Sequence, residues 1–73
     1  MKILLYGTGS CHLCEQAKAM LRAAGIMVEY TDISTDVVLL ERYGERIPVL
    51  RRTDNGAELG WPFDEPALRK LLE

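Results

Sequence analysis

Two cysteines three residues apart are the residues of this chain best suited to chemistry. Cys11 and Cys14 are the only cysteines among its 73 residues, and they form a Cys-x-x-Cys motif. Two cysteines placed at random in this length would lie three apart roughly once in forty cases, so the spacing is informative. An offset of three within one helical turn also brings two sulfurs within reach of a bond. The motif therefore predicts a pair that exchanges between dithiol and disulfide.

The position of the motif predicts a different role for each cysteine. A short, nearly continuous apolar run, residues 2–6, is followed by a loop, residues 7–10, and a stretch with helical spacing begins within the motif. Unpaired backbone N–H groups and the helix dipole favour a thiolate at a helix N-terminus, and the thiolate is the form that attacks disulfides. We therefore expect Cys11 to be the nucleophile and Cys14, one turn further in and more buried, to be the resolving thiol. His12 would add positive charge beside Cys11 when protonated, whereas the carboxylate of Glu15 would oppose it.

Two alternatives to redox chemistry remain open for this pair. The cysteines could be small buried hydrophobic residues in a redox-inert binding module. They could also bind a metal or an iron–sulfur cluster, with His12 as a third ligand. A structural zinc site normally has four protein ligands, and the sequence holds no further cysteine or histidine. A carboxylate or a second copy of the chain would have to complete such a site, so we expect no metal in the single chain.

One domain spanning residues 1–73 must position the motif, because the chain is too short for two cores and shows no linker or repeat. Apolar runs predict strands at residues 2–6, 27–31, 47–51 and 57–59. The first helix is expected to bury one face and to end at Gly25; that face comprises Leu13, Ala17, Met20, Leu21 and Ala24. A second helix, roughly residues 35–43, is expected to be capped from residues 32–34 and closed by Gly44.

The C-terminal half carries turn and cap signals. Residues 54–56, Asp-Asn-Gly, predict a hairpin that returns as an antiparallel edge strand. Pro48 is expected at the start or edge of its strand, since it cannot donate a ladder hydrogen bond. Asp64 is expected to cap a last helix, with Phe63 and Leu68 as its hydrophobic staple. The resulting order is βαβαββα in an α/β domain, with a right-handed first crossover.

Composition and charge narrow the classes of partner. Nine basic and eleven acidic residues give a net charge of −2, so no basic excess favours nucleic-acid binding. The first apolar run is too short for a signal peptide or a membrane span. We therefore expect a cytoplasmic monomer with no membrane contact. Structural disulfides are rare in that compartment, which favours a reactive role for the cysteine pair.

The order of motifs resembles the thioredoxin superfamily over nearly the whole chain. A strand, a Cys-x-x-Cys helix and a later Ile-Pro before a hairpin carry the resemblance. The layout lacks an extra N-terminal strand and helix, and in this it is similar to glutaredoxins. The patterns Cys-x-Leu-Cys-Glu-x-Ala, Arg-Ile-Pro-Val-Leu and Trp-Pro-Phe resemble a group of small bacterial glutaredoxin-like proteins. The resemblance implies a minimal thioredoxin fold with a four-stranded mixed sheet, and a thiol–disulfide oxidoreductase that acts on protein disulfides or glutathione mixed disulfides.

The resemblance also implies a substrate site. By analogy Pro48 is cis and faces the cysteines, and Ile47–Pro48 pair through their backbone with an extended substrate. His12 and Leu13, between the cysteines, are expected to contact substrate as well. Glutaredoxins bind glutathione through a Gly-Gly pair and acidic residues at the last helix, where this chain offers only Gly60 and Asp64. No bound cofactor is expected, and glutathione is a candidate co-substrate.

Three departures from the typical pattern concern glutathione more than the dithiol chemistry. The motif reads Cys-His-Leu-Cys instead of Cys-Pro-Tyr-Cys, no lysine stands shortly before Cys11, and the second glycine of the Gly-Gly pair is missing. Three aromatic residues near the expected site each allow two roles. Trp61 and Phe63 either anchor the last helix or form an apolar rim, and Tyr6 either lines the groove or is the last core residue of its strand.

Overall fold

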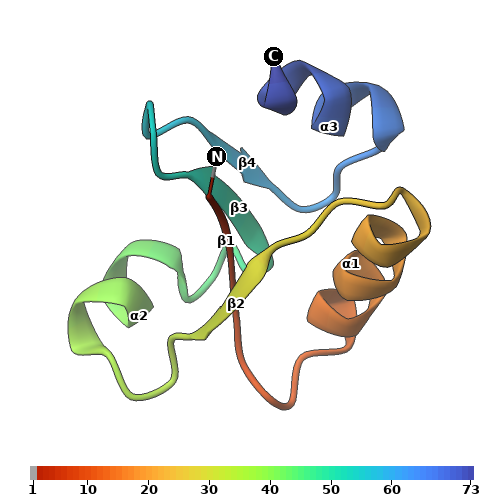
Figure 1. Ribbon diagram of the computed structural model, residues 1–73. Coiled ribbons are helices and arrows are strands. Elements are labelled where there is room, and N and C mark those ends of the chain that lie inside the picture. Colours follow the sequence, from red (N-terminus) through yellow and green to blue (C-terminus); the bar gives the residue numbers. More distant parts are fainter. Residues whose placement is uncertain (1) are drawn as a thin grey trace.

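Four short strands form one mixed sheet at the centre of the molecule, and three helices cover it (Figure 1). The computed structural model describes residues 2–73. Its strands are β1 (Ile3–Gly7), β2 (Glu29–Asp32), β3 (Val49–Arg52) and β4 (Glu58–Gly60). Its helices are α1 (His12–Ala23), α2 (Val37–Tyr43) and α3 (Glu65–Leu72). The predicted order βαβαββα and the α/β class are confirmed.

The strand order is β2-β1-β3-β4. β1 pairs in parallel with β2 and antiparallel with β3, and β3 pairs antiparallel with the edge strand β4. The hairpin between β3 and β4 turns at Gly56, whose φ of +74° lies in the left-handed region that glycine adopts readily. Pro48 directly precedes β3, so its missing N–H interrupts no ladder. Both sequence predictions for this region are therefore confirmed.

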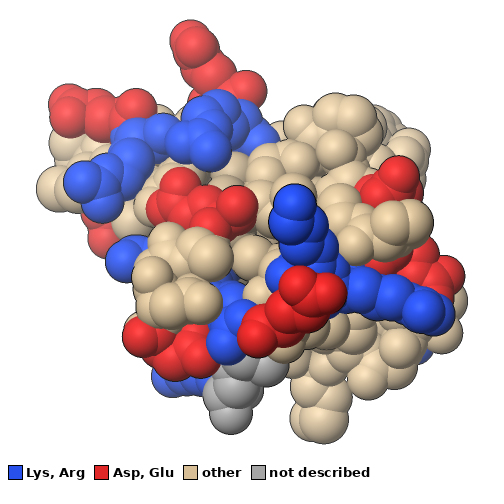
Figure 2. Space-filling view, turned by 90° about the horizontal axis from the view of Figure 1, so that it is seen from above, with Lys and Arg blue, Asp and Glu red and all other residues tan. Residues whose placement is uncertain are grey.

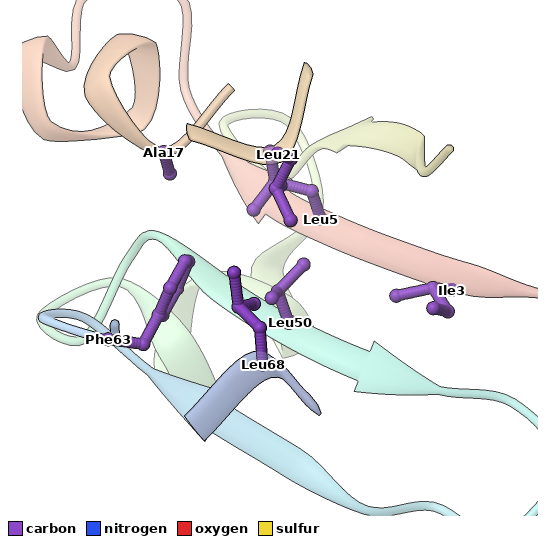
Figure 3. Packing of buried hydrophobic residues seen from close by; sticks show 7 residues of the cluster. All are labelled: Ile3, Leu5, Ala17, Leu21, Leu50, Phe63 and Leu68. Atoms are coloured by element: carbon purple, nitrogen blue, oxygen red, sulfur yellow. The ribbon is translucent and has the colours of Figure 1, made fainter. Parts of the chain in front are cut away.

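The two faces of the sheet carry separate apolar clusters because side chains alternate along each strand. The larger cluster lies beneath α1 and α3 and comprises Ile3, Leu5, Ala17, Leu21, Leu50, Phe63 and Leu68 (Figure 3). Leu5 and Leu50 meet there because they are directly paired between β1 and β3. The smaller cluster, on the α2 side, comprises Tyr6, Ile33, Tyr43 and Val49. Tyr6 stacks on Tyr43 with the ring centroids 4.7 Å apart, so it is a core residue and does not line a groove.

The buried face of α1 differs from the predicted one. Cys14, Ala17 and Leu21 are buried, whereas Leu13 is 43% exposed and Ala24 is exposed. Each helical residue is rotated by about 100° from the one before it, so a stripe that includes Cys14 turns Leu13 toward solvent. The C-terminus follows the prediction, because Gly25 has a φ of +72° and the N–H of Ile26 reaches the carbonyl of Leu21 at 2.9 Å.

Two local predictions around α2 are wrong. The helix starts later than expected, and its cap is the carboxylate of Asp36, which accepts from the N–H of Leu39 at 3.1 Å. Asp32, in the range expected to cap this helix, instead accepts from the N–H of Ser34 and shapes the turn after β2. Gly44 follows the helix but has a φ of −53°. A Cβ there would lie 2.5 Å from the carbonyl oxygen of Leu40, so close approach is what requires glycine.

The second strand and the surface complete the description. β2 starts at Glu29, two residues later than predicted, and Met27 is 91% exposed because it lies before the paired segment. Acidic and basic side chains are interspersed over the face shown in Figure 2, so neither sign dominates that face. Within residues 2–73, no helix has the length and apolar character needed to cross a bilayer.

Candidate functional site

The cysteine pair lies at the end of the sheet where β1 gives way to α1. β1 ends at Gly7, a four-residue loop follows, and α1 begins at His12 (Figure 1). Cys11 and Cys14 are joined as a disulfide, with their Cα atoms 5.2 Å apart. This separation lies within the ordinary range for a bridged pair, so the turn holds both sulfurs ready for bond formation without rearrangement.

Cys11 is the N-cap of α1. Its backbone is extended, and its Sγ accepts a hydrogen bond from the N–H of Cys14 at 3.1 Å. A sulfur in this place receives a helix-terminal N–H and the positive end of the helix dipole, both of which favour a thiolate once the disulfide is reduced. Cys11 is partly exposed, whereas Cys14 is 1% exposed. The pair therefore consists of an accessible sulfur at the helix terminus and a buried partner behind it.

Gly7 is a site residue that the sequence reasoning assigned to the loop. It is the last residue of β1 and is buried. A Cβ at Gly7 would lie 2.8 Å from the Sγ of Cys14 and 3.2 Å from Cε2 of Tyr30. The absence of a side chain here is what lets Cys14 pack onto the strand. The signal in the sequence is a glycine directly after an apolar run, which is typical of a close approach to the backbone.

A shallow surface hollow of about 250 Å³ adjoins Cys11. Its lining residues are Gly9, Ser10, Cys11, His12 and Glu15. His12, expected to contact substrate, thus borders the hollow, and Leu13 lies beside it as an exposed apolar side chain. An open hollow with an apolar neighbour can take an extended peptide or a small thiol, and it does not enclose a ligand.

Ile47 and Pro48 lie at the same end of the sheet. Tyr6 pairs with Val49, so the register puts Pro48 next to Gly7. The Ile47–Pro48 peptide bond is cis, as the resemblance implies. The N–H of Ile47 donates to the carbonyl of Tyr43 at 3.1 Å, and the carbonyl of Pro48 accepts from the N–H of Trp61 at 3.1 Å. Of the backbone groups of this pair, the carbonyl of Ile47 is the one without a backbone hydrogen bond within residues 2–73.

The two residues expected to bind glutathione lie in different settings. Gly60 pairs with Val49 at the end of β4, so it belongs to the same sheet end as the cysteines. Asp64 lies four residues further on and caps α3, where its Oδ1 accepts from the N–H of Ala67 at 3.0 Å. One carboxylate oxygen is thus used by the helix, which leaves the second for solvent or a ligand. Trp61 and Phe63 contact each other edge to face with their centroids 4.9 Å apart, and Phe63 is buried in the core.

Charged side chains around the motif are paired with one another. Glu15 lies 3.6 Å from the ammonium of Lys18, which itself lies 4.0 Å from the ring centroid of Tyr30. Burial raises the pKa of Tyr30 above its ordinary value, and the nearby Asp32 and Glu15 carboxylates add to the effect. The expected opposition of Glu15 to a thiolate is therefore reduced by a cation that the sequence reasoning did not identify. Among residues 2–73, no three or more His, Cys, Asp or Glu side chains are grouped so that they could hold a metal ion.

Comparisons with known proteins agree with this geometry. The sequence model of the Glutaredoxin-like domain (DUF836) matches residues 2–73. The crystal structure of protein XcR50 from X. campestris is 44% identical, with a TM-score of 0.84 over 96% of this chain and 93% of that chain. The solution structure of Ne2328 from Nitrosomonas europaea is 30% identical, with a TM-score of 0.82 over 94% of this chain and 87% of that chain. No protein with a curated description matches the chain. The fold is thus the minimal thioredoxin fold that the sequence predicts.

Proposed function

Since the chain belongs to the glutaredoxin-like domain family, we propose that it is a thiol–disulfide oxidoreductase that works through Cys11 and Cys14. The observation that carries this proposal is the cap of α1. The sulfur of Cys11 accepts the N–H of Cys14 at the helix terminus, while the Cys14 sulfur lies buried within bonding reach of it. A residue with only a packing role would not need a partly exposed sulfur at the helix N-terminus, where backbone groups favour its thiolate.

The proposed reaction proceeds in two exchanges. The Cys11 thiolate attacks one sulfur of a substrate disulfide; a bond to Cys11 forms, the substrate S–S bond breaks, and the departing sulfur keeps the electron pair and takes a proton from water. Cys14 then loses its proton and attacks the sulfur of Cys11. This forms the disulfide that the structure holds and releases the second substrate sulfur, again with the electron pair. The substrate gains two electrons from the protein and two protons from water, while the protein loses two electrons and the proton of Cys14.

The surroundings of Cys11 support a proposal for the class of substrate. The hollow beside it is open, and Leu13 adds apolar surface next to the exposed sulfur. These features favour an exposed disulfide of a protein or of a glutathione adduct over a ligand that must be enclosed. A thiol such as glutathione, or a dithiol donor, would restore the reduced form. A reducing compartment such as the cytoplasm, with the protein acting as a monomer, suits this cycle.

The test is a redox titration of the pair in glutathione buffers, with free thiols trapped and counted. We expect a reversible two-electron transition near the glutaredoxin range of roughly −200 to −230 mV. Cys11→Ser should abolish exchange with a disulfide substrate, whereas Cys14→Ser should stop at a stable mixed disulfide on Cys11. Two free thiols across the whole range in the unmodified protein would reject the oxidoreductase. Metal content and visible absorbance of protein purified without oxygen would then identify a metal-bridged dimer.

A further inference from the structure

The resolving cysteine presents a problem that the helix cap does not solve. Cys14 must become a thiolate before it can attack the sulfur of Cys11, but its side chain is 1% exposed. Burial disfavours the charged form of a thiol. The first-turn N–H that favours a charged Cys11 is the N–H of Cys14 itself, and it points at the other sulfur. A cation held near Cys14 would offset part of the cost of charging it.

Lys18 is in the position to do so. It lies four residues after Cys14 on α1, and residues at this spacing are neighbours on one face of a helix. Its ammonium lies 4.0 Å from the ring centroid of Tyr30, and the side chain is only 31% exposed. A cation that rests on an aromatic face and is partly shielded from water keeps a defined position. Lys18 is thus held toward the sheet and not left free in solvent.

Tyr30 connects this cation to the sulfur. The position that a Cβ of Gly7 would take lies 2.8 Å from the Sγ of Cys14 and 3.2 Å from Cε2 of Tyr30, so both side chains pack on the same glycine. The hydroxyl of Tyr30 is buried without a hydrogen-bond partner within residues 2–73. A buried hydroxyl without a hydrogen bond destabilises the fold. The ring that carries this hydroxyl is the platform on which the ammonium of Lys18 rests. Cys14 and Tyr30 thus flank Gly7, and Lys18 lies on the ring of Tyr30.

We propose that Lys18, held on the face of Tyr30, is a positioning residue that stabilises the thiolate of Cys14 during the resolving step. The inference rests on the proposed function, because only a dithiol mechanism requires a charged Cys14. In the step it assists, Cys14 releases its proton to water and the thiolate attacks the sulfur of Cys11. The new S–S bond forms as the bond from Cys11 to the substrate sulfur breaks, and the substrate leaves with the electron pair.

The other charged groups near Cys14 predict the direction of each effect. On α1 these are His12 and Glu15; on β2, Asp32 is paired with Gly7. From α3, Glu65 faces the C-terminal turn of α1 and not the first turn, which holds Cys14. The carboxylates act against a thiolate, and Glu15 does so twice, by its own charge and by pairing with Lys18 at 3.6 Å. Removal of the Glu15 charge should therefore have the opposite effect to removal of the Lys18 charge.

The experiment follows the release of thionitrobenzoate from Ellman's reagent by the reduced protein in a stopped-flow instrument. The first release reports the attack by Cys11, and the second reports the resolution by Cys14. For Lys18→Met we expect a second phase about 3- to 10-fold slower at neutral pH, with its midpoint shifted upward by about half to one pH unit. The first phase should change much less. Lys18→Arg should restore the second phase, because a guanidinium also stacks on an aromatic ring.

Three further variants make the assignment specific. Tyr30→Leu removes the platform and should slow the second phase as Lys18→Met does, without a further loss in the double variant. Tyr30→Phe keeps the ring and should behave like the unmodified protein. Glu15→Gln should lower the midpoint of the second phase. An unchanged second-phase pH profile in Lys18→Met, with both releases intact, would overturn the role of Lys18 alone. Absence of the second release in the unmodified protein would instead overturn the proposed function.

Discussion

At the start of α1 a sulfur atom fills the place that a carboxylate oxygen fills in the other two helices. Asp36 and Asp64 cap α2 and α3 at 3.1 and 3.0 Å, and Cys11 caps α1 at 3.1 Å. A thiol or disulfide sulfur is a weak acceptor, whereas a thiolate is a strong one. The helix N-terminus therefore binds most strongly to the reactive form of Cys11. Under the proposed function, this cap favours the thiolate of Cys11 in addition to stabilising the helix.

At the residue scale, Gly7→Ala tests how tightly Cys14 is packed against β1. The new Cβ would lie 2.8 Å from the Sγ of Cys14, so the sulfur or the strand must move. We expect a loss of about 1–3 kcal/mol in the free energy of unfolding and a slower resolving step. Urea unfolding and the second thionitrobenzoate release measure the two effects. Gly9→Ala is the matched control, because nothing lies within 4 Å of its added Cβ; equal losses in both variants would refute the explanation.

At the scale of the element, residues close in sequence determine where each helix begins and ends. Each N-terminus has a side-chain cap three residues before the N–H that it accepts, and α1 ends in a left-handed glycine. These features depend on residues within one or two turns. They therefore position the helix termini independently of the core and deliver Cys11 to the start of α1.

At the scale of α3, variants of Asp64 distinguish its role as the helix cap from its expected role in binding glutathione. Asp64→Ala should cost about 1 kcal/mol through loss of the N-cap, as should the control Asp36→Ala at α2. Asp64→Asn keeps a capping oxygen but removes the charge. We expect it to retain stability and to weaken the reaction with a glutathione mixed disulfide while sparing Ellman's reagent. Calorimetric unfolding and the two substrates test this; unchanged kinetics with both substrates would make Asp64 a cap alone.

At the scale of the whole molecule, one arginine joins the end of β3 to the end of α3. Arg52 is 8% exposed and donates to both carboxylate oxygens of Asp54, at 3.0 and 2.6 Å. It also donates to the carbonyl of Leu71 at 2.7 Å. The bond to Leu71 joins the last turn of α3 to the sheet across 19 residues of sequence, and the two bonds to Asp54 hold the guanidinium in place. Arg52 pairs with Ile3, at the end of β1 opposite to Gly7 and the cysteines.

The ion pair between Arg52 and Asp54 predicts that the stability of the protein falls in acid. The hydrogen bond from Arg52 holds the pKa of Asp54 below its ordinary value of 3.8 in the folded chain. The unfolded chain therefore takes up this proton first as pH falls, so the stabilisation is complete above pH 3.8 and is lost as pH falls through the folded pKa. Asp54→Asn should be less stable than the unmodified protein at neutral pH, and the difference should shrink in acid. Urea midpoints across this range test it; a difference independent of pH would contradict the assignment.

Signals within a few residues of one another determined most of the fold and the centre of the site. The Cys-x-x-Cys spacing, the strand before it, Gly25, the turn at residues 54–56 and the Asp64 cap each depend on local backbone preferences. Such preferences act over one or two turns and can be read along the chain. The pair Cys11 and Cys14 and the order of elements were accordingly predicted from the sequence.

Contacts between residues that are distant in sequence depend on the tertiary structure, so local patterns did not predict them. Gly7 beside Cys14, Lys18 on Tyr30 and Arg52 at Leu71 join residues of different elements. The stripe of α1 that faces the sheet, and with it the exposure of Leu13, depends on how that helix docks. A local pattern shows that a helix is amphipathic but does not fix its rotation when small and apolar residues occupy neighbouring faces. Strand register and helix docking bring these residues together, and neither is encoded at any one position.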